Sequence, residues 1–79
     1  MTEDQKAISL ILDLLHASKG VPRAYPYLET EMKLAGRRCE LPSILDQMAD
    51  AKLIASHKDA LGIRRYTITP AGRDALDSI

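Results

Sequence analysis

The apolar periodicity of the sequence changes after the third helical stretch, close to Lys52, and this change limits the possible folds more than any other feature. Before it, apolar residues recur at three- and four-residue steps in three separate stretches, as in amphipathic helices. After it, two short runs with β-branched and aromatic residues, 53–58 and 63–68, flank a glycine-containing loop, as in a β-hairpin. The 79 residues have room for only one hydrophobic core. We therefore predict a single domain over residues 1–79, mainly α with a small β-hairpin.

Each of the three predicted helices has recognisable start and stop signals. The first opens on a capping-box spacing between Thr2 and Gln5, and a glycine ends it. The second and third helices each carry a proline near the first turn, where a missing N–H is tolerated. The predicted helices begin after Thr2, at Pro26 and at Leu41, and they end near Gly20, Gly36 and Lys52.

The remaining segments complete the order of elements. Residues 21–26 form a predicted connector, because two prolines four residues apart exclude a helix interior. Thr69 and Pro70 give a cap and a first-position proline for a last helix. Three helices, a two-stranded ribbon and a fourth helix have the layout of a helix-turn-helix followed by a wing.

The passage from Leu45 to Leu76 resembles the winged helix-turn-helix regulators of the MarR and PadR type. The most specific part is Tyr66–Arg73, because these families commonly close the wing with a tyrosine, an alternating strand and a Thr-Pro-x-Gly helix start. Lys52 stands where these regulators usually have a glycine, so the third helix must end differently or place Lys52 in a left-handed conformation. The layout is also similar to small winged-helix proteins encoded by prophages. The resemblance implies a DNA-binding transcriptional regulator, with the third helix in the major groove and the 54–68 hairpin as the wing.

Charge is distributed unevenly along a chain whose net charge is zero. Neutrality argues against DNA binding through bulk charge. Residues 19–38, however, hold five cations and two carboxylates, and residues 54–66 hold three cations and one carboxylate. These are the turn before the third helix and the wing, which lie against the DNA backbone in this architecture.

The candidate DNA-binding residues fall into three groups: phosphate contacts before the third helix, base contacts on its exposed face, and phosphate or minor-groove contacts on the wing. The same residues have structural interpretations as solvated turn and helix positions, or as charges that protect a strand edge from aggregation. In chain order the three groups are Arg37 and Arg38, then Ser43 and Gln47, then His57, Lys58, Arg64 and Arg65.

Three carboxylates near the third helix favour a second function. Glu40, Asp46 and Asp50 would be repelled by phosphates unless they accept a hydrogen bond from a cytosine amino group. The alternative is therefore a winged-helix protein–protein interaction module that uses this acidic face.

Catalysis and metal binding have no sequence support. His16, Cys39 and His57 are scattered and lack the spacing of metal ligands, so we predict a non-enzyme without metal or cofactor. The single cysteine, the acidic polar start and the absence of a long apolar run predict a cytoplasmic protein. The expected partners are double-stranded DNA and a second copy of the chain, bound through the first and last helices, with a protein partner as the alternative.

Overall fold

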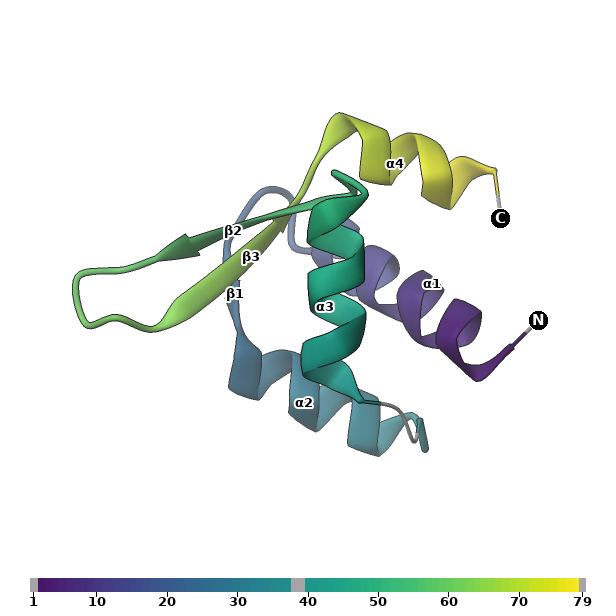
Figure 1. Cartoon of the computed structure of the whole chain (residues 1–79), viewed down its shortest axis with the longest axis horizontal. Helices are drawn as coiled ribbons and strands as arrows, with labels where there is room; N and C mark the ends of the chain where they lie inside the picture. The colour runs from purple at the N-terminus through teal and green to yellow at the C-terminus, as the bar shows by residue number, and fades with distance from the viewer. Residues whose placement is uncertain (1, 38–39, 79) are drawn as a thin grey trace.

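The computed structural model describes residues 2–37 and 40–78 and has four helices and a three-stranded antiparallel sheet within them (Figure 1). The mainly helical fold with a hairpin after the third helix confirms the predicted fold class. In chain order the elements are α1 (Glu3–Ala17), β1 (Arg23–Ala24), α2 (Tyr25–Leu34), α3 (Leu41–Asp50), β2 (Ile54–Lys58), β3 (Arg64–Ile68) and α4 (Pro70–Asp77).

One hydrophobic core joins the helices to the base of the hairpin. Helix α1 packs against α2, α3, α4 and β3, so its apolar stripe supplies the centre of that core. Its N-terminus is held by the predicted capping box: Thr2 Oγ1 accepts from the Gln5 N–H at 3.1 Å, and Gln5 Oε1 accepts from the Thr2 N–H at 3.0 Å. The buried apolar residues are Ala7, Ile11, Leu12, Leu15, Leu28, Met32, Leu41, Ile44, Leu45, Met48, Ile54 and Tyr66.

The predicted connector contains a strand that the sequence pattern did not indicate. Arg23 pairs with Tyr66 and Ala24 with Arg65, which makes β3 the central strand of the order β1-β3-β2. Two residues are too few to show an alternating apolar pattern. They are a strand only because they form backbone hydrogen bonds with β3. Arg23 fixes the strand to the end of α1, because its Nε donates to Ser18 Oγ at 2.8 Å, and to α2, because its guanidinium lies 4.7 Å from the centre of the Tyr27 ring.

A wing-base joint, formed by Lys52, Leu53, Thr69 and Gly72, connects α3, the hairpin and α4. Lys52 adopts the left-handed conformation with φ 65°, one of the two exits that we predicted in the absence of a glycine. Thr69 Oγ1 donates to the carbonyl oxygens of Lys52 at 2.6 Å and Leu53 at 2.9 Å, and it accepts from the Gly72 N–H at 3.0 Å. A Cβ atom on Gly72 would overlap the Leu53 carbonyl oxygen. The joint therefore fixes the orientation of the hairpin relative to α3.

Candidate nucleic-acid interface

The exposed face of α3 carries the side chains expected to contact bases. Leu41, Ile44, Leu45 and Met48 turn into the core, and this leaves the remaining positions toward solvent. Ser43 and Gln47 are exposed one turn apart, with Gln47 Nε2 at 3.4 Å from Ser43 Oγ. This long hydrogen bond occupies one amide hydrogen and leaves the Gln47 carbonyl oxygen without a protein partner in the described part of the chain.

Asp46 and Asp50 lie exposed on the same helix. Neither forms an ion pair with any residue in 2–37 or 40–78. Glu40, the N-cap residue of α3, is also exposed and makes no side-chain capping bond. The third helix therefore presents a mixed polar and acidic surface.

Arg37, on the turn between α2 and α3, is only half-buried. It borders a hollow of ≈ 280 Å³ shared with Glu29, Glu40 and Leu41, and another surface hollow beside α1. Its Nε is buried and has no hydrogen-bond partner among the described residues. The second predicted arginine of this turn, Arg38, lies outside the described residues.

The wing, residues 54–68, projects from the body of the molecule next to α3 (Figure 1). Its register places Lys58 directly opposite Arg64 and His57 directly opposite Arg65. His57, Lys58 and Arg64 are exposed, and no ion pair holds them within the described structure. Lys58 and Arg64 are like charges directly opposite each other, an arrangement that is destabilising on a two-stranded ribbon. Because no described carboxylate pairs with them, they give the outer end of the wing an exposed positive surface.

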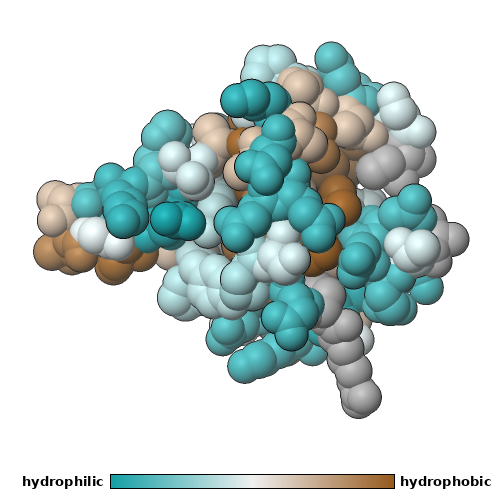
Figure 2. All heavy atoms as spheres, in the orientation of Figure 1, coloured by the Kyte–Doolittle hydropathy of each residue, from teal (hydrophilic) through white to brown (hydrophobic). Residues whose placement is uncertain are grey.

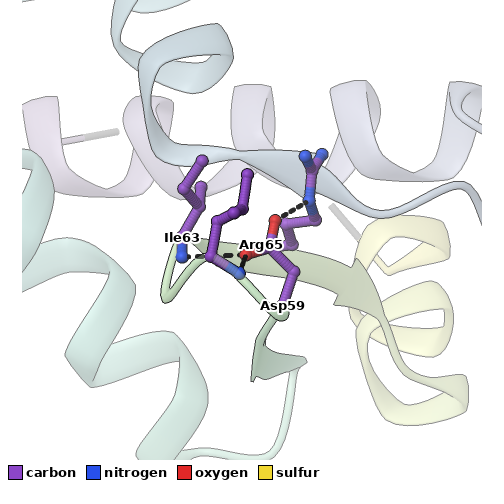
Figure 3. Close-up of polar contacts among 4 residues, drawn as sticks. Asp59, Ile63 and Arg65 are labelled. Carbon is purple, nitrogen blue, oxygen red and sulfur yellow. Dashed lines mark hydrogen bonds and ion pairs between the residues drawn. The ribbon is translucent and has the colours of Figure 1, made fainter.

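Arg65 differs from the other wing cations because it pairs with an aspartate of the same hairpin. Its Nε donates to Asp59 Oδ2 at 3.1 Å, while Asp59 Oδ1 accepts from the Leu61 N–H at 2.9 Å and the Ile63 N–H at 3.0 Å (Figure 3). We call Asp59 with these three donors the tip clamp. The backbone hydrogen bond from Ile63, followed by the Arg65 and Leu61 hydrogen bonds, holds the pKa of Asp59 below its ordinary value despite some desolvation. The clamp favours the ionised form of Asp59 and engages Arg65 through its Nε.

The tip clamp is not apparent from the charge pattern of the wing, in which Asp59 is a single negative charge. The available signal is the order Asp-x-x-Gly between two strands, because an aspartate at the start of a loop commonly accepts hydrogen bonds from backbone N–H groups that follow it. Gly62 fits this pattern with φ 79°.

The structure brings together one part of the predicted site and separates another. Helix α3 lies next to the wing, whereas the α2 end that leads to Arg37 lies away from the wing tip (Figure 1). In the described ranges 2–37 and 40–78, no group of three or more His, Cys, Asp or Glu side chains is placed to hold a metal ion. Every helix in these ranges is too short or too polar to cross a membrane.

Comparison with known proteins adds no relative: no family model, no curated protein and no solved structure matches the chain. The class is therefore defined by topology alone. A hairpin that follows the third helix and precedes a short fourth helix gives the chain a winged-helix-like fold.

Proposed function

We propose that the chain is a DNA-binding winged-helix transcriptional regulator that places α3 in the major groove of double-stranded DNA and the wing against the backbone and minor groove. The observation that carries this proposal is the pairing of Lys58 with Arg64 across the outer end of the wing. In the free protein this pair of like charges opposes stability. A phosphate placed between the two cations turns the repulsion into two attractive contacts.

The α3 face supports a second contact of a different kind. A glutamine can form a bidentate pair with adenine, and a serine hydroxyl can donate to or accept from several base edges. Gln47 and Ser43 are both exposed for such contacts. Asp46 and Asp50 repel phosphates and so lower the affinity for DNA of any sequence. Each carboxylate can, however, accept a hydrogen bond from a cytosine amino group. The combination fits a protein that depends on its target sequence rather than on charge alone.

A salt titration of duplex binding tests the wing contact. The exposed cations Lys58 and Arg64 are changed to glutamine together, and the matched control changes Lys19 and Arg73, two exposed cations that border a hollow between α1 and α4. Each lost phosphate contact lowers the slope of log K against log salt by about 0.9. We expect the slope to fall by roughly two in the wing variant and to stay unchanged in the control. Equal slopes for the two variants would contradict the proposal.

We further propose that two copies associate through α1 and α4, so that two wings and two α3 helices contact adjacent half-sites. Leu10 and Leu14 of α1 and Leu76 of α4 are apolar and only partly buried in the single chain, which supports this arrangement. Molar mass in solution tests it, because the chain alone is 8.7 kDa. A measured mass equal to that of one chain at micromolar concentration would exclude the dimer.

A protein-interaction module is the second candidate, and the unpaired carboxylates of α3 favour it. The double variant Asp46→Asn/Asp50→Asn separates the two functions, because it changes them in opposite directions. Removing both charges should strengthen non-specific duplex binding at low salt, where phosphate repulsion dominates. The same change should weaken binding to a partner with a basic surface.

A further inference from the structure

The wing tip, residues 59–63, exposes apolar side chains at the outermost part of the hairpin. Leu61 is 84% exposed and Ile63 40% exposed. Figure 2 shows the apolar colour gathered at the end of the projecting wing, beyond a hydrophilic zone. Neither side chain belongs to the core cluster or packs against it within the described residues. Within the described residues these side chains therefore add nothing to the core, and Leu61 lies almost wholly in solvent.

The tip holds its apolar side chains on a well-tied backbone. Besides the tip clamp, the Gly62 N–H donates to the Asp59 carbonyl oxygen and the Asp59 N–H donates to the Ile63 carbonyl oxygen, both at 3.0 Å. Because these bonds fix the loop before any partner arrives, binding through Leu61 requires little additional ordering of the backbone.

Two cations lie directly behind the apolar tip, on the side that faces the helices. Lys58 and Arg64 form the last pair of the ladder, immediately behind the loop. The one carboxylate of the tip, Asp59, already accepts three hydrogen bonds, one of them from Arg65. The partner that fits is therefore apolar or aromatic at its centre and negatively charged at its rim. A second copy of the tip does not fit, because the cations of the two copies would meet.

We propose that Leu61 and Ile63 form an apolar wedge that enters the minor groove of duplex DNA and contacts a base step, while Lys58 and Arg64 bind the flanking phosphates. This inference rests on the proposed function and adds a specific mode of contact to it. Apolar side chains that enter the minor groove partly unstack a base step and bend the duplex by about 20–90°. The wedge therefore favours flexible pyrimidine–purine steps without forming hydrogen bonds to their bases.

Bending of a doubly labelled duplex tests the wedge. A duplex with a central TA step carries a donor and an acceptor dye at its two ends, and binding of the intact chain should raise the energy transfer between them. Leu61→Ser should abolish this rise and weaken binding about tenfold, because burial of the leucine in the groove is lost. Its salt slope should remain that of the wild type, since Lys58 and Arg64 are retained.

The matched control is Leu34→Ser, which removes another exposed leucine, 77% exposed, from the end of α2. It should bind and bend the duplex as the wild type does. If Leu61→Ser bends the duplex as strongly as the wild type, the wedge is wrong and the DNA-binding function stands. If the wild type shows no salt-dependent binding, the proposed function itself fails. If Leu61→Ser lowers the molar mass of the DNA-free protein, the tip is a contact between copies, which also overturns the wedge.

Discussion

The two ends of the hairpin are built in different ways. At the base, Ile54 and Tyr66 are buried in the core. Thr69, directly after β3, is hydrogen-bonded to the carbonyl oxygens of Lys52 and Leu53, directly before β2. At the tip, one carboxylate organises the loop and Leu61 extends into solvent, with the exposed cations Lys58 and Arg64 directly behind the loop. One element thus combines a packed end, where a change of shape is costly, with an open end, where a change of chemistry is tolerated.

This contrast separates the sources of stability and of binding within fifteen residues. Side chains at the base contact other parts of the protein, so substitutions there should lower the free energy of unfolding. The described side chains of the tip lie outside the core, so substitutions there should alter partner binding and leave the fold intact.

The largest difference between the two ends is expected from their glycines. Gly72→Ala should destabilise the protein by about 2–3 kcal/mol, because the new methyl group overlaps the Leu53 carbonyl oxygen and the joint must shift. Gly62→Ala meets no atom within 4 Å but places an alanine at φ 79°, at a cost of about 1 kcal/mol. Urea unfolding followed by circular dichroism measures both. A Gly62 variant that is the less stable of the two would contradict this assignment.

A smaller, stabilising change is expected at the exit of α3. Lys52 is a non-glycine residue with φ 65°, and its side chain is exposed. Lys52→Gly should raise the free energy of unfolding by up to about 1 kcal/mol, since the left-handed conformation costs an L-residue roughly 1–2 kcal/mol and glycine loses part of this gain through its greater unfolded-state freedom. Lys52→Ala is the control, because it keeps the Cβ atom and should leave stability nearly unchanged.

Reversing the charge of Lys58, directly behind the tip, should change stability and DNA binding in opposite directions. Lys58→Glu faces Arg64 with an opposite charge, so the free protein should gain a few tenths of a kcal/mol. The same variant should lose duplex affinity, because a carboxylate then faces the phosphates. Thermal unfolding and a binding titration on one preparation test both. Loss of stability together with unchanged binding would mean that the wing cations serve only the fold.

The smallest global effect is expected from the tip clamp, and it depends on pH. The pKa of Asp59 is lowered in the folded protein, so its contribution to stability is present above the ordinary aspartate pKa. That contribution is lost as the pH falls through the lower folded-state pKa, below about pH 4. The Leu61 and Ile63 amide NMR shifts should titrate in this range while core resonances stay fixed. Asp59→Asn should abolish the titration, and a titration that persists in this variant would assign it to another group.

The sequence alone predicted the fold well, because its signals are local. The change of period near Lys52 and the Thr69-Pro70 helix start each depend on a few neighbouring residues. The strand β1 was not predicted, since its two residues acquire their pairing only from β3.

The candidate site was predictable by position and much less by interaction. His57, Lys58 and Arg64 are exposed on the wing as expected, whereas Arg65 is drawn into an ion pair with Asp59. Charge counting cannot distinguish these cases, because pairing depends on how the loop turns. For the same reason it could not reveal that Leu61 points into solvent at the end of a loop that one carboxylate holds in place.

The hydrogen bonds of the tip clamp and of the wing-base joint also imply an order of folding. The bonds of the tip clamp join residues two to six positions apart, whereas the bonds of Thr69 to Lys52 and Leu53 join residues 16 and 17 positions apart. Short loops close on the scale of tens of nanoseconds and hairpins within microseconds, so the outer wing can form before the core has assembled. The wing-base joint has to wait for α3 and β3 to meet. We therefore expect substitutions at Asp59 to slow folding and substitutions at Gly72 mainly to speed unfolding.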